Sequence, residues 1–332
     1  MSHLLQPLTA GPLPLKNRLV VPPMATSKAD ADGTMSDAIL DYYDEKSRGG
    51  ALGLVITEHC FIARQGQARI GQPSVANDDM LDGLTRLSAV IHANGPKAVV
   101  QINHTGGAAS SAVTGQEVVS ASHVPSPIGS GEVPRALTRD EIAAVVAQFA
   151  VAASRVKHAG FDGVEIHSAH GYLLNQFFSP ITNRRTDEYG GDVLGRIRLH
   201  LEVIAAVREA VGEGYPVLLR LGASDFRDGG TCIEDSVAAA VEFERAGIDL
   251  IDVTGGLSGY IWPGHEEPGY FAELSAPIKE AVSIPVILTG GVTEPRHAEE
   301  LLARGVADLI GVGRAMLKDS GWAVRAVREY AG

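Results

Sequence analysis

Short apolar runs recur along this chain, and segments of helical length separate most of them. The run at 52–57, Leu-Gly-Leu-Val-Ile-Thr, lacks polar alternation, which is typical of a strand buried on both faces. The same pattern predicts eight strands, at 18–21, 52–57, 97–102, 163–166, 216–221, 249–253, 285–288 and 308–311. Strands of this kind occur in parallel sheets that helices cover on their faces.

The segments between the strands predict helices, and several of these carry capping residues. Thr138 with Glu141, and Thr231 with Glu234, have the spacing of a capping box, and Thr293 is expected to cap a further helix. Counted from their caps, the helices are predicted at 36–48, 79–93, 138–158, 196–211, 231–246, 273–282 and 293–304. A short hairpin is expected at 7–15, around a Gly-Pro pair.

This alternation predicts a single domain over residues 1–332, an α/β fold of the (β/α)8 TIM-barrel type with an N-terminal hairpin. An open doubly wound sheet is the alternative, but no Gly-x-Gly-x-x-Gly follows the first strand, and the turn there is rich in proline. Long inserts follow the third, fourth and sixth strands. Since barrels place their chemistry in the loops after the strands, we expect these long loops on the catalytic face.

Composition narrows the class of protein. The 332 residues are 45% hydrophobic, and the net charge of -12 disfavours nucleic acid and membrane as partners. Cys60 and Cys232 are the only cysteines, and without a Cys-x-x-Cys motif we expect no iron–sulfur cluster and no metal site of that kind. The first residues lack the features of a signal peptide, and no apolar run is long enough for a bilayer. We expect a soluble, cytoplasmic protein. The sequence is compatible with a homo-oligomer but does not determine the oligomeric state.

The densest candidate chemistry follows the fourth strand. His167, His170 and Tyr172 lie within six positions. Two neutral imidazoles can donate to a carbonyl or phenolate oxygen, and a phenol with a pKa near ~10 stays protonated at neutral pH and can donate a proton. This set of groups suits the reduction of a polarised double bond. A packed loop with structural histidines is the alternative, which the occurrence of three such groups together disfavours.

Two glycine-bearing turns follow the last two strands. Gly290 and Gly291 come after the seventh strand, and Gly313 and Arg314 come after the eighth. In barrels this pair of turns is the standard phosphate site, because glycine lets backbone N–H groups approach the phosphate. An arginine adds a fork of donors. The pair predicts a ligand that carries a phosphate.

Arg220 and Gln101 stand on predicted barrel strands. The guanidinium does not lose its charge, so Arg220 needs an anion or another acceptor there. A bound ligand would satisfy it, and so would an ion pair with Asp225 or Asp252. Gln101 offers a donor and an acceptor to a ligand, although a structural role is the simpler interpretation of this residue alone.

The segment 165–191 resembles the Old Yellow Enzyme family, the FMN-dependent NADH:flavin oxidoreductases and ene-reductases. The matching residues are Glu-Ile-His-Ser-Ala-His-Gly-Tyr-Leu at 165–173, Ser179-Pro180, Asn183 and Arg-Thr-Asp-Glu-Tyr-Gly-Gly at 185–191. The His-x-x-His form resembles the bacterial branch, and the resemblance covers nearly the whole chain. It implies an FMN-binding TIM barrel with NADPH or NADH as hydride donor.

The resemblance also implies a set of cofactor contacts. Pro22, Pro23, Met24, Ala25, His59, Gln101, His167 and Arg220 would contact the flavin ring, and Gly290, Gly291, Gly313 and Arg314 would bind the phosphate. Relatives often have Cys or Thr at the position of Ala25, one bacterial subgroup has Tyr at the position of Ser27, and Arg is usual at the position of Gly107. These departures affect the redox tuning and the substrate pocket rather than the choice of cofactor.

By this resemblance the expected reaction reduces an alkene conjugated to a carbonyl or nitro group, in a small-molecule substrate. Hydride passes from flavin N5 to the β carbon, His167 and His170 hold the substrate oxygen, and Tyr172 protonates the α carbon. Enones, nitro compounds, dienoyl thioesters and steroid-like molecules are all compatible with the sequence.

Two other functions stay open. Glu165, His167 and His170 could serve a metal-dependent TIM-barrel lyase or hydrolase, but no His-x-His occurs and the phosphate turns would be unexplained. The chain could also be a non-catalytic flavin-binding protein. Larger relatives add an iron–sulfur motif and a second nucleotide domain, which we do not expect here. Arg325 or Arg328 could reach a neighbouring subunit's site, although a solvated helix face is the simpler interpretation.

Overall fold

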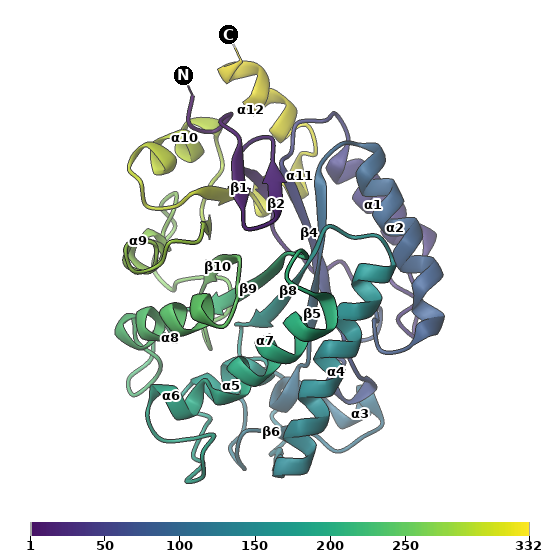
Figure 1. Ribbon diagram of the computed structural model, residues 1–332, viewed down its shortest axis with the longest axis vertical. Coiled ribbons are helices and arrows are strands. Elements are labelled where there is room, and N and C mark those ends of the chain that lie inside the picture. The colour runs from purple at the N-terminus through teal and green to yellow at the C-terminus, as the bar shows by residue number, and fades with distance from the viewer. Residues whose placement is uncertain (1, 332) are drawn as a thin grey trace.

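The predicted barrel is present in the computed structural model, which describes residues 2–331 (Figure 1). Its parallel strands close into a ring in the order β10-β11-β12-β3-β4-β5-β8-β9. They are β3 (Leu19–Val21), β4 (Leu54–Phe61), β5 (Lys97–Asn103), β8 (Gly163–Ser168), β9 (Val217–Gly222), β10 (Leu250–Thr254), β11 (Val286–Thr289) and β12 (Leu309–Gly311). The eight predicted strands are confirmed, with ends that differ by at most four residues.

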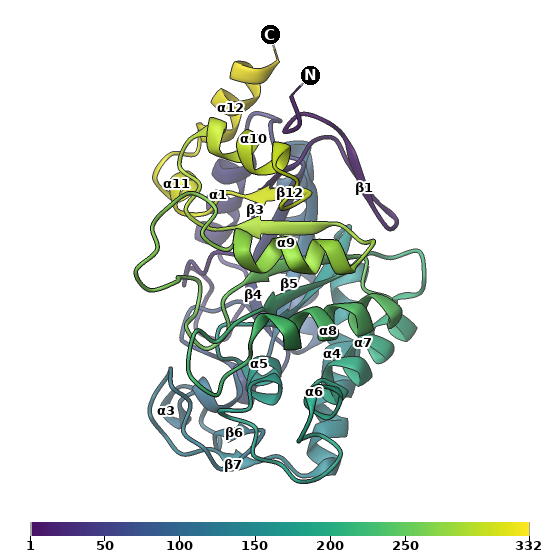
Figure 2. The same ribbon diagram turned by 90° about the vertical axis from the view of Figure 1, so that its left-hand side faces the viewer.

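Helices surround this ring (Figures 1 and 2). The longer ones are α1 (Asp37–Ser47), α2 (Leu81–Ala93), α4 (Arg139–His158), α7 (Arg198–Val211), α8 (Ile233–Arg245), α9 (Ala272–Ala281), α10 (Pro295–Ala303) and α12 (Trp322–Tyr330). Shorter ones are α3 (Ser111–Thr114), α5 (Leu173–Phe178), α6 (Val193–Arg196) and α11 (Arg314–Lys318), with 3-10 turns at Arg64–Gly66, Asp78–Met80 and Gly106–Ala108. The predicted helices are confirmed, whereas these short ones were not predicted, and α12 was expected only as a helix face at Arg325 and Arg328.

The barrel interior changes character along its strands. An apolar layer of fully buried side chains consists of Val20, Leu54, Ile56, Val99, Leu218, Leu250, Ile287 and Leu309. Inward positions recur at every second residue of a strand. Two residues beyond this layer, Val99 is followed by Gln101, Leu218 by Arg220 and Leu250 by Asp252. These three residues and Glu165 form a polar layer, which lies nearer the C-terminal ends of the strands.

The N-terminal hairpin closes the opposite end of the barrel. Strands β1 (Leu8–Ala10) and β2 (Leu13–Leu15) pair antiparallel, and their buried Ala10, Leu13 and Leu15 pack against the apolar layer (Figure 2). Gly11 forms the turn with a φ of 53°, and a Cβ there would lie 2.2 Å from Asp249 Oδ1. Glycine is therefore required where the turn touches the barrel.

Of the predicted capping boxes, one is confirmed and one is wrong. Thr138 accepts from the backbone N–H of Glu141, whose side chain accepts in return, at the start of α4. Helix α8 instead has Cys232 as its N-cap residue, and no side chain caps it. The backbone N–H of Thr231 donates to Asp225 over 2.8 Å. A tertiary hydrogen bond therefore holds Thr231 outside the cap position.

The predicted cap at Thr293 is also wrong. Glu294 occupies the N-cap position of α10, and its side chain accepts from the backbone of His297. Pro295 follows as the first helical residue, a position that proline favours because its missing N–H would have no partner there. The carbonyl of Thr293 accepts from Trp322 Nε1 over 2.7 Å, which ties α12 to this turn.

Long loops gather at the C-terminal ends of the strands, as predicted. The insert after β5 carries α3 and the short pair β6 (Val119–Ser120) and β7 (Arg135–Ala136), and the insert after β8 carries α5 and α6 (Figure 2). A third loop, 255–271, follows β10. Among the described residues, no helix combines the length and apolarity that crossing a bilayer requires.

Candidate active site

His167, His170 and Tyr172 come from the end of β8 and the turn after it. The ring centroid of His167 lies 5.0 Å from that of His170 and 5.2 Å from that of Tyr172. His170 has a positive φ of 56°, and a hydrogen bond of 3.0 Å joins its Nε2 to Thr254 Oγ1 at the end of β10. A non-glycine residue in this conformation is uncommon, and such residues cluster at functional sites.

Burial sets the protonation states of these groups. It lowers the pKa of His167 well below its usual value, and His170, His59 and Arg220 lower it further. Burial also lowers the pKa of His170. Both imidazoles are therefore neutral at pH 7, and each keeps one N–H to donate. Burial raises the pKa of the Tyr172 phenol, which stays protonated.

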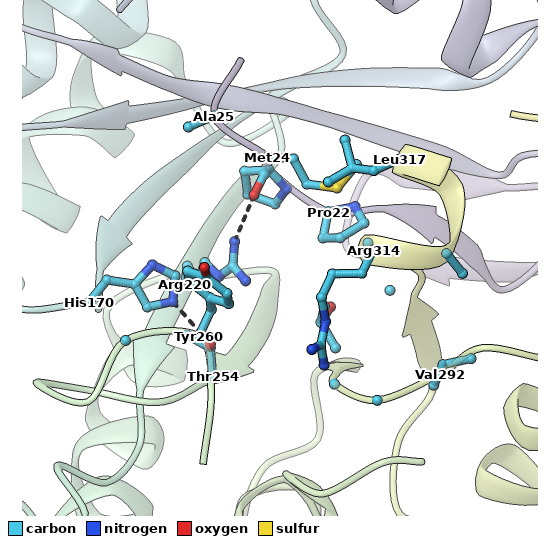
Figure 3. A pocket seen from close by; sticks show the side chains of 18 of the residues that line it. Pro22, Met24, Ala25, His170, Arg220, Thr254, Tyr260, Val292, Arg314 and Leu317 are labelled. Carbon is cyan, nitrogen blue, oxygen red and sulfur yellow. Dashed lines mark hydrogen bonds between the residues drawn. The ribbon is translucent and has the colours of Figure 1, made fainter. Parts of the chain in front are cut away.

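A cavity of about 1080 Å³ lies at the C-terminal ends of the strands and gathers the predicted site residues (Figure 3). Its lining includes Pro22, Pro23, Met24, Ala25, His59, Gln101, His167, His170, Tyr172, Arg220, Gly290, Gly291, Gly313 and Arg314. In Figure 3, His170 and Arg220 lie on one side of the view, and Arg314 lies on the other, beneath Pro22. Residues from distant parts of the chain therefore face one space.

In the polar layer, Gln101 and Arg220 are tied to two buried carboxyl groups. Gln101 Nε2 donates to Glu165 Oε2 over 2.6 Å, and Arg220 Nε lies 3.2 Å from Asp252 Oδ2. The ion pair with Asp252 was one of the two pairings considered for Arg220. The other candidate, Asp225, accepts its hydrogen bonds elsewhere.

The ion pair of Arg220 leaves donors free. Although the charges are close, Arg220 Nε and both carboxylate oxygens of Asp252 have no hydrogen-bond partner among the described residues. Arg220 Nη1 makes one long contact, 3.5 Å, to the carbonyl of Pro23. The alignment is therefore poor for hydrogen bonding, and the guanidinium can still donate to a ligand in the cavity.

The glycine turns build the other end of the cavity. Gly291 has a φ of 66°, and a Cβ there would lie 2.4 Å from the carbonyl oxygen of Glu267. A Cβ at Gly290 would lie 2.9 Å from the ring of Tyr270. Arg314 Nη2 makes only a 3.5 Å contact to the Tyr270 hydroxyl, and it forms no ion pair within residues 2–331. At this end of the cavity, the guanidinium of Arg314 therefore has no anionic partner among the described residues. It lies at the same end as the backbone of Gly290 and Gly291, where there is no room for a side chain.

These features fit FMN, which has one phosphate and one flat ring system. The unpaired Arg314 and the glycine backbone suit the phosphate. The free donors of Arg220 and the amide of Gln101 suit the polar edge of the ring, while Pro22 and Pro23 offer a rigid apolar contact. Buried donors without partners are rare unless a ligand or water satisfies them.

His59 was predicted to contact the flavin ring, and the structure places it in the cavity lining. Its ring centroid lies 5.3 Å from that of Tyr172 and 5.9 Å from that of His167. Gln72 Nε2 lies 2.8 Å from its Nδ1, and Arg69 Nη2 lies 3.3 Å from its Nε2. His59 therefore narrows the cavity beside the proposed acid.

The residues that depart from the family pattern are not all in the cavity. Ala25 lines it, whereas Ser27 and Gly107 do not. Arg325 lines its rim and forms an ion pair with Asp319. Arg328 is exposed on α12 and does not line the cavity.

Some lining residues were not predicted. Thr254 follows Asp252 by two positions on β10, so the period of the strand could have identified it. Arg69 and Tyr270 come from loops, where no periodicity shows which way a side chain points. Among the described residues, no three His, Cys, Asp or Glu side chains are grouped as a metal ion would need. Glu165, His167 and His170 thus do not converge in the manner that the metal-dependent alternative requires.

A parallel barrel with an unpaired arginine beside glycine turns, and with a neutral His pair beside a phenol, is suited to a flavin cofactor. The family model described as the NADH:flavin oxidoreductase / NADH oxidase family matches residues 3–331. The chain belongs to this family, whose cofactor is FMN.

Curated relatives carry related names. A metal reductase of Desulforamulus reducens is 42% identical over 96% of this chain and 48% of its own length. An NADH oxidase of Thermoanaerobacter brockii is 40% identical over 95% of this chain and 49% of its length. The chain thus spans about half the length of these two relatives. It is also 38% identical to an NADPH dehydrogenase of Listeria monocytogenes, over 99% of this chain and 95% of that protein.

Solved structures agree with the fold. A 2-naphthoyl-CoA reductase superposes with a TM-score of 0.93 at 28% identity, over 98% of this chain and 52% of that chain. Morphinone reductase superposes with a TM-score of 0.85 at 28% identity, over 99% of this chain and 91% of that chain. An old yellow enzyme homologue from Zymomonas mobilis gives 0.86 at 27% identity, over 98% and 93% of the two chains.

Proposed function

We propose that this chain is an ene-reductase, which uses FMN and NADPH or NADH to reduce an alkene conjugated to a carbonyl or nitro group. The observation that carries this proposal is the neutral pair His167 and His170 beside the protonated Tyr172, in a cavity that fits FMN. Two structural neighbours are named as reductases of organic molecules, morphinone and 2-naphthoyl-CoA, which supports an organic substrate.

Bound FMN supplies the two-electron carrier between NAD(P)H and the substrate. His167 and His170 bind the substrate oxygen through their N–H groups, which draws electron density from the alkene and stabilises the negative charge that develops on this oxygen. Thr254 orients His170 through the 3.0 Å hydrogen bond to Nε2. Tyr172 gives its hydroxyl proton to the α carbon, and the phenolate regains a proton from solvent.

The proposal extends to the setting of the reaction. We infer one FMN-binding domain over 1–332, a small-molecule substrate with an electron-poor alkene, no nucleic-acid or membrane partner and a cytoplasmic location. The net charge of -12 supports the absence of anionic partners. A homo-oligomer is compatible with this arrangement, and size-exclusion chromatography with light scattering would determine the assembly.

Isotope labelling tests the proposal directly. The purified holoenzyme is incubated without oxygen with 2-cyclohexenone or a nitroalkene, and with NADH or NADPH deuterated at C4. Donor deuterium should appear at the β carbon of the product, and in D2O with unlabelled donor, deuterium should appear at the α carbon. Turnover with oxygen or ferric ions, which the names of two relatives suggest as acceptors, but with none of the alkenes would contradict the proposal.

A further inference from the structure

Arg69 is a cation in the cavity that none of the roles above uses. It lies in the loop after β4, half-buried, and lines the cavity together with His59 and Tyr172. The loop is held firmly at this point. Gly71 has a φ of 81°, and its carbonyl accepts from the backbone N–H of Ala29 over 3.0 Å. The position of Arg69 is therefore set by the fold rather than by solvent.

Arg69 has no anion of its own. Within residues 2–331 it forms no ion pair, and its buried Nε has no hydrogen-bond partner. The carboxylate of Glu58 is near enough to interact electrostatically with Arg69, but both its oxygens accept hydrogen bonds from Thr26. A guanidinium removed from water needs an acceptor, because it cannot lose its charge.

A comparison with the other arginines of the cavity shows why the missing anionic partner of Arg69 is informative. Arg220 lies beside Asp252, and Arg325 lies beside Asp319. Only Arg314 resembles Arg69 in having no carboxylate partner among the described residues, and Arg314 lies at the end of the cavity that fits a phosphate. By the same reasoning, Arg69 marks a second place in the cavity where an anionic group binds.

The contacts of His59 also support an anion-binding site at Arg69. Gln72 Oε1 accepts from the backbone N–H of Ala68 over 2.6 Å, so the amide nitrogen faces His59 and donates to its Nδ1 over 2.8 Å. Burial lowers the pKa of His59 to about 3, so the ring is neutral and its one proton is assigned to Nε2. Arg69 Nη2 lies 3.3 Å from that Nε2. Two donors thus face one space without an acceptor.

We propose that Arg69 and the Nε2–H of His59 together bind a carboxylate of the substrate. This inference rests on the proposed function and names its substrate class: an electron-poor alkene that carries a carboxylate in addition to the oxygen bound by His167 and His170. Arg69 acts in specificity, because it selects the substrate and takes no part in hydride or proton transfer. A bidentate guanidinium–carboxylate contact gives both strength and orientation.

The spacing of the rings indicates a short molecule. The ring centroids of His59 and His167 are 5.9 Å apart, and Tyr172 lies within 5.3 Å of both. A 4-oxo-2-alkenoate has its ketone oxygen and its carboxylate at opposite ends of one alkene. It would place the ketone at the histidine pair and the carboxylate at Arg69, with the alkene next to Tyr172.

A matched pair of substrates tests this assignment. The kcat/KM of the holoenzyme is measured with trans-4-oxopent-2-enoate and with its methyl ester, in which a neutral group replaces the carboxylate. The wild type should prefer the acid, and Arg69→Gln should lower the acid-to-ester ratio by roughly 10-fold to 100-fold, as expected for loss of a charge-assisted hydrogen bond. Arg64→Gln is the control, because exposed Arg64 lies on the same loop, outside the cavity lining.

A binding measurement separates this inference from the proposed function. Calorimetry with 4-oxopentanoate and its methyl ester, which have no alkene to reduce, should show tighter binding of the acid in the wild type and loss of that preference in Arg69→Gln. This result would support the carboxylate site even if no alkene were reduced. An unchanged acid-to-ester ratio, or a variant that loses only affinity for NADPH, would overturn it; the latter would assign Arg69 to the donor's phosphates.

Discussion

The two layers inside the barrel are separated by two residues along β5, β9 and β10, and they differ in almost every property. The apolar layer is closed by the hairpin β1–β2 and contains only aliphatic side chains from the barrel strands. The polar layer holds Glu165, Arg220 and Asp252 with several unpartnered donors and acceptors. The comparison indicates that one layer holds the barrel together and the other carries the charges on which the cavity depends. Substitutions should therefore separate into two kinds, those that change stability and those that change chemistry.

The largest expected effect is on chemistry alone. Tyr172→Phe removes the hydroxyl proton and little else, so reduction of the alkene should slow by roughly 10²-fold to 10⁴-fold, the usual contribution of a general acid. Reduction of FMN by NAD(P)H needs no proton from Tyr172 and should keep its rate. Stopped-flow absorbance measures the two half-reactions separately, and equal losses in both would show that Tyr172 has a structural role.

The next effect is on stability alone. Leu218→Ala opens a cavity in the apolar layer, two residues before Arg220, and should lower the free energy of unfolding by about 2–5 kcal/mol. Urea denaturation followed by circular dichroism measures this loss. The FMN content and the alkene turnover of the folded variant should match the wild type. A variant with unchanged stability and impaired turnover would show that the two layers are not independent.

A smaller effect is expected at the histidine pair. His170→Ala removes a donor to the substrate oxygen, so binding of a phenol that mimics this oxygen should weaken by about 1–3 kcal/mol. His170→Asn is the matched control, because its amide retains a donor and should bind the phenol better than the alanine variant does. Titrations followed in the visible flavin band give both dissociation constants. Equal affinities in all three proteins would remove His170 from the site.

The last expected effect, small for each unit of pH, is a pH dependence that arises in the polar layer. Burial, and then the charge of Asp252, raise the pKa of Glu165 from 4.5 to about 8. The folded state therefore keeps a proton that the unfolded chain releases, so this contribution to stability is complete below pH ~4.5 and is lost as the pH rises to about 8. One proton gives a slope of at most about 1.4 kcal/mol per pH unit.

Glu165→Gln should remove that slope while it keeps an oxygen to accept from Gln101. Unfolding free energies measured at several pH values from 5 to 9 test this, with Glu209→Gln on the exposed face of α7 as control. The control should retain the wild-type dependence on pH. A Glu165→Gln protein with the same dependence as the wild type would show that another group holds the proton.

The sequence was sufficient for the barrel because its strands are continuous apolar runs and the local signal agrees with the fold. The candidate site could also be predicted from the sequence, since His167, His170 and Tyr172 are close in sequence and Arg220 is a charged residue on a buried strand. The helix starts at Thr231 and Thr293 were predicted incorrectly, because Asp225 in one case and Pro295 in the other decide where the chain turns. Where these two helices begin depends on a tertiary contact in one case and on competition between neighbouring capping residues in the other.

Arg69 was missed for a different reason. A cation in a polar loop has the same local sequence whether it faces solvent or a cavity, and only the contacts at Gly71, Gln72 and His59 show that it faces inward. The ion pair of Arg220 could be narrowed only to Asp225 or Asp252, because the register that places Asp252 opposite Arg220 belongs to the closed sheet.

The hairpin β1–β2 at the N-terminal end of the barrel also determines how molecules enter and leave the cavity. The aliphatic side chains that it covers are fully buried, so residues 2–331 leave no passage along the barrel axis. Every molecule that reaches the cavity must cross the loop face, and every product must leave by the same face. Hydride donor and oxidant are therefore expected to compete for entry, and an excess of either should slow the turnover of the other.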